Sequence, residues 1–183
     1  IPRLDVKDKA TGKALYAGDF NLPDQVYMKI LFAGRPHAIV KEIDTTEAEA
    51  MNGVLAVLTA KDVPVNEYGL IVPDQPVLCG PGSEKPFTDR VRFVGDQVAV
   101  VIAETEKIAE LALEKIKVDF EDLPVVTSIE EAEAEDAALL HPERGSNNFC
   151  HYQIRKGNVE EAFEKCDVIV EGEYRTPVQE HAF

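Results

Sequence analysis

The fold is decided by one continuous stretch, residues 91–121, which reads VRFVGDQVAVVIAETEKIAELALEKIKVDFE. Residues 97–103 are apolar and β-branched, and they predict a buried strand. Thr105 can cap a helix running to about Lys115. The apolar residues of this stretch recur at the spacing of a stripe that packs on a sheet, and they are Ile108, Leu111, Ala112 and Ile116. Residues 117–121 alternate apolar and charged side chains, as a half-buried strand does. This strand–helix–strand order indicates an α/β (α+β) fold.

Shorter elements flank this stretch on its N-terminal side. A turn at residues 34–36 separates two predicted strands, and a capping-box spacing predicts a short helix from Thr45 or Thr46. A third strand, one further helical turn and a fourth strand are also expected. The predicted strands cover residues 26–33, 37–43, 54–58 and 91–94, and the helical turn covers residues 59–62. The chain before residue 26 is polar and turn-rich, and it predicts an extended lead-in.

Regular patterns disappear between residues 64 and 88, where prolines alternate with glycines. A structureless run of this length inside a compact domain is often functional or mobile. Further on, a capping box begins at Ser128, and five carboxylates within residues 130–136 suit a solvated helix face or tether better than a calcium site. Asn158 can start a helix to about residue 165, and residues 167–174 alternate as a last strand would.

Composition limits the class of partner. The chain has 183 residues, 45% of them hydrophobic and 29% charged, which is ordinary for a soluble globular protein. Its net charge of −15 repels phosphate groups, so nucleic acid and anionic membrane surfaces are disfavoured as partners. No apolar run has the length of a membrane span.

Motifs for metal binding or catalysis are absent from the sequence. The three cysteines form no Cys-x-x-Cys pair and the four histidines form no His-x-x-x-His pair, so we expect reduced thiols and no zinc site. Residues 80–85 lack the strand–loop–helix setting of a phosphate-binding loop. There is no Gly-x-Ser-x-Gly motif either. From the residues alone, the chain is an acidic α/β domain with an interrupted extension.

Three stretches in this order and spacing carry more information. They are RVRFVGDQVAVV at residues 90–101 with VDFEDLP at 118–124, then GNVEEAF at 157–163 with DVIVEG at 167–172, and QEH at 179–181. Together they resemble the start of the large, molybdenum-binding subunit of the xanthine dehydrogenase and aldehyde oxidase family. The opening IPRLD, with TGKA at residues 11–14 and Tyr16, is similar to the lead-in of the same family.

The resemblance implies a domain order. Residues 1–14 would be an extended lead-in, residues 15–130 the α/β hammerhead domain, residues 131–146 an acidic linker, and residues 147–183 the start of the first molybdopterin-binding domain. Because the chain starts at Ile1 and stops at Phe183, we expect a piece of a longer polypeptide.

The resemblance also implies an activity for the complete enzyme, an oxidoreductase. A molybdopterin-type molybdenum cofactor with oxo, sulfido and hydroxide ligands hydroxylates a carbon of a purine, another heteroaromatic compound or an aldehyde, with oxygen taken from water. Electrons leave through iron–sulfur clusters, usually to FAD, on partner subunits or domains. The piece alone is expected to be inert and to bind no cofactor, and a cytoplasmic, oligomeric enzyme is expected.

One position matches a site residue of the family. Gln179 resembles the glutamine whose amide hydrogen-bonds the oxo ligand of the molybdenum, and it is the expected catalytic and cofactor-facing residue. Glu180 and His181 are expected to have structural roles. No residue is expected to ligate a metal.

An alternative from a different class is left open by the residues. The chain could be a non-catalytic α/β protein-interaction module that binds a partner through residues 64–88. A hydrolase that uses the many carboxylates has no specific motif.

Overall fold

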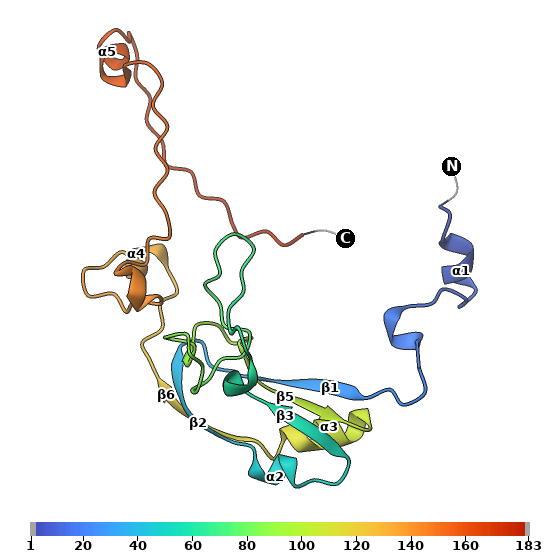
Figure 1. Cartoon of the computed structure of the whole chain (residues 1–183). Helices are drawn as coiled ribbons and strands as arrows, with labels where there is room; N and C mark the ends of the chain where they lie inside the picture. The colour runs from blue at the N-terminus through green and yellow to red at the C-terminus, as the bar shows by residue number, and fades with distance from the viewer. Residues whose placement is uncertain (1–2, 182–183) are drawn as a thin grey trace.

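The computed structural model describes residues 3–181 and consists of two small antiparallel sheets, one covering helix and a long C-terminal excursion (Figure 1). The expected mixed α/β class is confirmed. Four residues at the two ends of the family-like sequence lie outside the described range: Ile1, Pro2, Ala182 and Phe183.

The first sheet is built around β5 (Gln97–Ala103). This strand pairs antiparallel with β1 (Tyr27–Phe32) along one edge and with β3 (Val54–Leu58) along the other. Five of its seven side chains are buried, as the apolar sequence predicts. A strand that is paired on both edges and covered on its faces can be almost continuously apolar.

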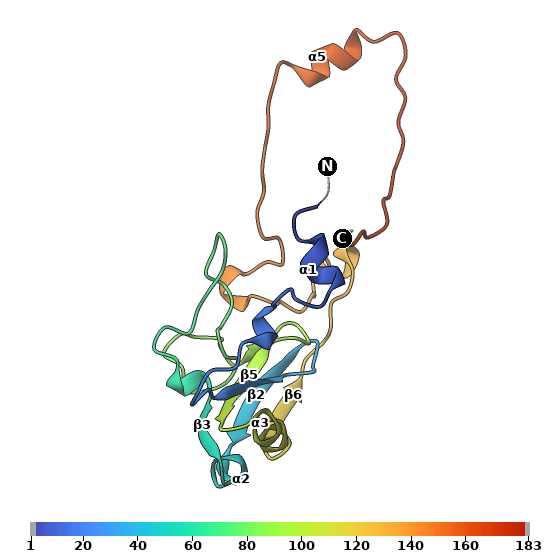
Figure 2. The same ribbon diagram turned by 90° about the vertical axis from the view of Figure 1, so that its right-hand side faces the viewer.

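Helix α3 (Glu106–Leu113) covers one face of this sheet and touches both β1 and β5 (Figure 2). Thr105 caps it as predicted, with its hydroxyl accepting from the Ile108 amide at 3.2 Å. The predicted apolar stripe is wrong at one position, because Leu111 is 38% exposed and Ala109 is fully buried. Small alanines on this face let the helix approach β5 closely.

The second sheet has the order β4-β2-β6, with β2 (Ala38–Asp44) between β4 (Arg90–Val91) and β6 (Lys117–Asp122). The strand predicted over residues 91–94 is therefore much shorter than expected. The Asp96 carboxylate accepts from the amides of Arg92 at 2.7 Å and Phe93 at 3.2 Å, which removes those two amides from strand pairing.

Short elements occupy most of the other predicted positions. The short helix predicted from Thr45 or Thr46 forms with Thr45 as its N-cap, but the capping box that its spacing suggested does not form. The Thr45 side chain makes no capping hydrogen bond, and the Thr46 amide donates to the Asp44 carboxylate instead. The capping box predicted at Ser128 forms. The helical turn expected over residues 59–62 also forms, and it begins with a capping box at Thr59 that was not predicted from the sequence. The remaining elements are α2 (Thr46–Glu49), η2 (Ala60–Asp62), α4 (Ile129–Ala132), η3 (Pro142–Arg144) and α5 (Val159–Glu164).

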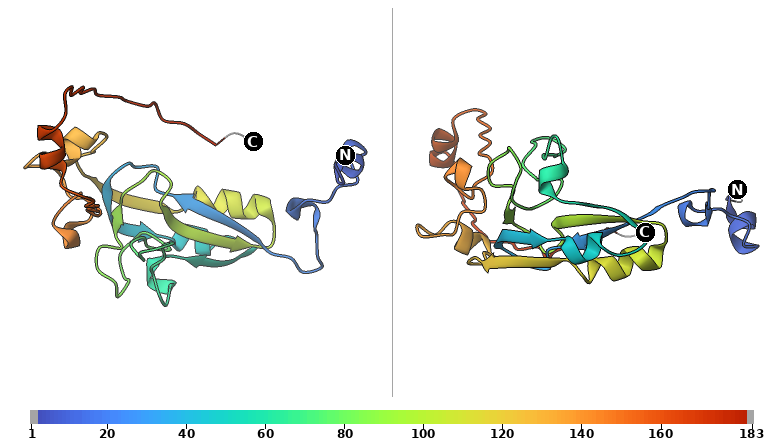
Figure 3. Two further views of the ribbon diagram at one scale, coloured as in Figure 1. Left: turned by 90° about the horizontal axis from the view of Figure 1, so that it is seen from above. Right: turned by 60° about the horizontal axis from the view of Figure 1, so that its bottom comes forward.

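The lead-in expected to be extended over residues 1–14 contains a helix, α1 (Val6–Ala10), followed by η1 (Ala17–Asp19). A Lys9–Asp5 ion pair at 2.7 Å, one helical turn apart, favours this local helix, which the turn signals at residues 11–13 did not reveal. Figure 3 shows α1 and α4 at opposite ends of the sheets.

The loop over residues 64–88 lacks helices and ladder strands, as the sequence indicates, and it has a single isolated bridge between Tyr68 and Gln75. It is nevertheless anchored. The buried Asn66 side chain donates to the Leu78 carbonyl at 2.8 Å and accepts from the Leu78 amide at 2.9 Å.

The last strand, predicted over residues 167–174, is wrong for the described residues. Every residue from 148 to 181 is exposed, and this excursion turns around at α5 away from both sheets (Figures 1 and 2). A strand needs a neighbour to satisfy its backbone groups. No described strand pairs with these residues.

We expect Val101→Thr to lower the free energy of unfolding by about 1–3 kcal/mol, the mutational cost of burying a hydroxyl without a partner. Val101 is 0% exposed and lies in the core between β5 and α3. Urea denaturation measures the loss. Val94→Thr is the matched control, since Val94 is 52% exposed, and equal unfolding midpoints for the two variants would contradict the assigned core.

Candidate functional site

The predicted site residue, Gln179, lies on the exposed stretch that follows α5. Its neighbours make local contacts: the His181 amide donates to the Glu180 carboxylate at 3.0 Å. Arg175 pairs with Glu173 at 2.9 Å and reaches Glu130 at 3.7 Å, all at the surface. The described structure therefore presents Gln179 outward and brings it together with no other predicted site residue.

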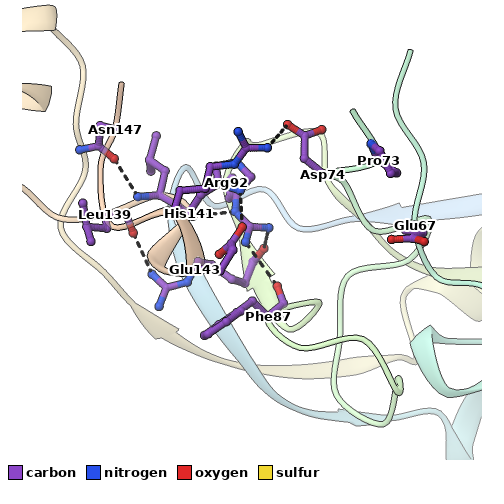
Figure 4. Close-up of polar contacts among 12 residues, drawn as sticks. Glu67, Pro73, Asp74, Phe87, Arg92, Leu139, His141, Glu143 and Asn147 are labelled. Carbon is purple, nitrogen blue, oxygen red and sulfur yellow. Dashed lines mark hydrogen bonds and ion pairs between the residues drawn. The ribbon is translucent and has the colours of Figure 1, made fainter. Parts of the chain in front are cut away.

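The excursion that carries Gln179 leaves the sheets through a joint, residues 137–147, and a polar network holds this joint (Figure 4). Arg92 is the largest contributor. Its Nε donates to the Leu140 carbonyl at 2.7 Å, and its two terminal nitrogens lie 3.4 Å from the Arg90 carbonyl and 3.5 Å from the Phe87 carbonyl. Burial lowers the pKa of Arg92, with the Glu143 charge opposing that effect, but a guanidinium keeps its charge in proteins.

Asn147 closes the joint from the other side. Its Oδ1 accepts from the Leu140 amide at 3.1 Å, and its Nδ2 donates to the carbonyls of Ala132 and Ala138, each at 3.1 Å. An asparagine supplies both donors and acceptors, so one side chain satisfies three backbone groups, two of them within residues 138–140 and one at Ala132.

Two further contacts attach the joint to the 64–88 loop and to the start of the excursion. Arg144 lies 3.8 Å from Asp74 and stacks over the Phe149 ring, 4.9 Å from its centroid. Beside it, His141 pairs with Glu143 at 3.0 Å.

Arg90 connects the joint to a buried histidine. One terminal nitrogen of Arg90 lies 3.1 Å from Nε2 of His37 and 3.5 Å from the Leu139 carbonyl. Nδ1 of His37 lies 2.6 Å from the Pro124 carbonyl, which can only accept. Because arginine can only donate, the tautomer with its proton on Nδ1 makes both contacts. His37 is 2% exposed and thus acts as a fixed polar link between three chain segments.

Open cavities lie along the same loop. One of about 450 Å³ is lined by residues 61, 63–67 and 82–85, and another of about 240 Å³ lies between Asp74, Phe87 and the joint. Lys85 pairs with Glu67 and donates to the Pro73 carbonyl at 2.9 Å. No helix follows residues 80–85, so they do not form a phosphate-binding loop.

Neither a metal site nor a membrane span is visible in the described range. Among residues 3–181 there is no group of three or more His, Cys, Asp or Glu side chains that could hold a metal ion. None of the helices described there is long and apolar enough to cross a membrane.

The arginine pair was not assigned a role from the sequence. Arg90 belongs to β4 and Arg92 follows it directly, and both side chains reach the same short segment, residues 139–140. What they bind are backbone carbonyls of residues nearly fifty positions later, and carbonyls are present in every sequence.

Two family models match the chain, in order and without overlap. One, described as "Aldehyde oxidase and xanthine dehydrogenase, a/b hammerhead domain", matches residues 11–124. The other, described as "Molybdopterin cofactor-binding domain", matches residues 140–183. The joint of residues 137–147 therefore spans the start of the second match.

Curated relatives match nearly the whole chain. A probable xanthine dehydrogenase subunit of Bacillus subtilis is 43% identical over 183 residues, which are 99% of this chain and 23% of that protein. The "Nicotinate dehydrogenase large molybdopterin subunit" of Eubacterium barkeri is 33% identical over 182 residues, covering 99% of this chain and 40% of that subunit. The chain thus spans less than half the length of these relatives.

Solved structures agree. The aldehyde oxidoreductase from Desulfovibrio desulfuricans superposes with a TM-score of 0.71 at 37% identity, covering 91% of this chain and 19% of that one. A Cu,Mo-CO dehydrogenase superposes with a TM-score of 0.74 at 29% identity, covering 92% of this chain and 22% of that one.

The cysteines give a test of the described packing. All three are free thiols; Cys79 is buried, whereas Cys150 and Cys166 are exposed. Burial disfavours the thiolate and raises the pKa of Cys79 to about 12, so this thiol stays protonated at mildly alkaline pH.

We expect iodoacetamide to label Cys150 and Cys166 but not Cys79 in the folded chain, as read by mass spectrometry. Labelling in concentrated guanidinium chloride, where Cys79 also reacts, is the control. Rapid labelling of Cys79 in the folded chain would contradict its placement.

Proposed function

The chain belongs to the aldehyde oxidase and xanthine dehydrogenase family, and on that basis we propose that it is the N-terminal part of the molybdenum-binding subunit of a molybdenum hydroxylase. The observation that carries this proposal is the order of the two family matches on one chain, a hammerhead domain followed by a molybdopterin cofactor-binding domain. The complete enzyme would hydroxylate a purine, another heteroaromatic compound or an aldehyde. The relatives' names refer to different substrates, xanthine and nicotinate, and both are heteroaromatic compounds.

The proposed domain boundaries follow the sequence. The hammerhead domain would cover residues 15–130, after a lead-in of residues 1–14, and the molybdopterin-binding domain would begin at residue 147 after a linker of residues 131–146. All residues that the structure buries lie between Ala33 and Ile116, inside the first of these domains. The exposed apolar side chains after residue 147 suit a second domain whose packing surface lies elsewhere.

In this proposal Gln179 is the residue that faces the molybdenum cofactor. The donor chemistry fits a contact to the cofactor, because a primary amide donates a hydrogen bond without adding charge. No residue of the chain is proposed as a direct ligand of the metal. When bound, the cofactor would supply the oxidation chemistry. Gln179 would donate its amide to the oxo ligand and thereby orient the group.

The proposal includes partners and location. Iron–sulfur clusters and FAD would belong to partner subunits or domains, and the Bacillus subtilis relative is itself named as one subunit of a dehydrogenase. Free cysteines without a disulfide fit a reducing compartment, so we propose a cytoplasmic enzyme. The 183 residues by themselves would not turn over substrate, since they span 23% of that relative.

Elemental mass spectrometry tests the proposal directly. Molybdenum would be measured per chain in the natural gene product and, beside it, in the 183-residue chain. We expect close to one molybdenum per chain in a gene product of relative-like length and none in the 183-residue chain. Absence of molybdenum from a folded gene product made in a cofactor-competent host would favour the interaction module that the sequence leaves open.

We expect Gln179→Ala in the complete enzyme to retain molybdenum and to lower kcat by roughly 10- to 100-fold, the usual cost of losing a partner that orients a metal's ligand. Steady-state kinetics normalised to molybdenum content measure the effect. Gln153→Ala is the matched control, because Gln153 is also an exposed glutamine of the excursion. If both variants turn over like the wild type, Gln179 has no part in the reaction.

A further inference from the structure

We propose that Arg90, Arg92 and Asn147 form a clamp on the joint, and that this clamp sets the direction in which the segment carrying Gln179 leaves the hammerhead domain. The three are then positioning residues for Gln179. The clamp itself is argued from the contacts around residues 138–140. Its consequence for catalysis rests on the function proposed above.

The clamp acts on the backbone. Leu140 is held through both of its main-chain groups: its carbonyl accepts from Arg92 at 2.7 Å and its amide donates to Asn147 at 3.1 Å. The preceding carbonyl, that of Leu139, lies 3.5 Å from Arg90. Contacts at consecutive peptide groups fix the course of the chain, whereas contacts to flexible side chains would leave it free to turn.

The two arginines also reach the joint from a rigid place. Arg90 belongs to β4, which pairs with β2 of the second sheet, and it is further held by the buried His37. Arg92 directly follows this strand, and its amide donates to the Asp96 carboxylate at 2.7 Å. Arg92 is fastened through the carbonyls of Phe87 and Arg90. Arg92 holds the joint more firmly than Arg90 does, because Nε of Arg92 donates to the Leu140 carbonyl, whereas Nε of Arg90 is buried without a hydrogen-bond partner among residues 3–181.

Stability alone gives a weak reason for this arrangement. Burying a guanidinium forfeits much of its hydration, and apolar residues of similar size often stabilise a protein as well or better. The protein tolerates the burial of these guanidinium groups and the Arg90 Nε that has no hydrogen-bond partner among the described residues. The arginines act at the boundary between the two family matches, where a defined course of the chain is useful.

Nothing described beyond the joint can replace the clamp. From residue 148 to residue 181 every residue is exposed. Among the described residues, one ion pair connects residues 148–181 with the earlier part of the chain. It joins Arg175 and Glu130, whose side chains are 78% and 72% exposed. Exposed pairs of this kind are screened and hold little.

The test uses the complete enzyme with Arg92→Lys, Arg92→Ala and Asn147→Asp. Lysine keeps the charge but loses the fork that reaches three carbonyls, and aspartate replaces the two amide donors that face the Ala132 and Ala138 carbonyls. Matched controls are Arg35→Ala, at an exposed arginine, and Asn148→Asp, at the neighbouring exposed asparagine.

Hydrogen exchange read by mass spectrometry reports the clamp without any need for turnover. We expect faster exchange across residues 138–147 in the three clamp variants and unchanged exchange in the two controls. We also expect kcat per molybdenum to fall by roughly 10- to 100-fold, as a displacement of about 1 Å at a reacting centre does, with KM close to that of the wild type.

Normalising to molybdenum separates positioning from folding, because a purely structural loss lowers the amount of loaded enzyme and leaves kcat per molybdenum intact. Unchanged exchange in all three variants would overturn the clamp. Faster exchange with unchanged kcat per molybdenum would overturn the positioning role. A wild-type enzyme without molybdenum would instead contradict the proposed function, and the exchange rates would still decide whether the clamp exists. Gln179→Ala with normal turnover would remove the proposed role of Gln179 and, with it, the positioning role of the clamp.

Discussion

The double pairing of β5 is the constraint on which the rest of the structure depends. This strand supplies the centre of the first sheet, and its side chains feed three different cores. Ala99, Val101 and Ala103 pack under α3, Val98 packs with the second sheet, and Val100 packs with Ala60 and Leu78. Strand β5 also connects directly to α3, and α3 leads into β6 of the other sheet. Both sheets are therefore held together by one continuous stretch of about thirty residues.

That constraint explains how much of the fold the sequence could predict. Where the pattern is strong and the partners are near in sequence, as for β5, α3 and β6, the expected elements form almost to the residue. The errors have specific causes. Leu111 has the right spacing for the core, but the helix rotates so that the smaller Ala109 faces the sheet. The Asp96 side chain takes the amides that a longer β4 would use. Residues 167–174 have strand-like alternation, yet alternation cannot supply the neighbouring strand that backbone hydrogen bonds require.

The candidate site was predictable to a smaller extent, for a different physical reason. Gln179 carries no local signal of the role proposed for it: it is one exposed glutamine, and only its place within a family-like sequence singles it out. The contacts at the joint could not be predicted either, but for a different reason. Arg92 and Leu140 lie far apart in sequence, and the contact uses a carbonyl, so no residue type at position 140 announces it. Contacts between a side chain and a distant backbone become visible only when the fold has placed both.

The distribution of burial separates the chain into a part that explains its own stability and a part that does not. Every residue that the structure buries lies between Ala33 and Ile116, so the two sheets and α3 account for the hydrophobic core. After the joint, apolar side chains such as Val168, Val170 and Tyr174 are largely exposed. A contiguous run of exposed apolar side chains marks a surface that packs against something else. No residue among 3–181 covers these side chains. For such a segment, the stiffness of its attachment matters more than its own structure, because a firmly held joint limits the directions in which the apolar run can meet its packing surface.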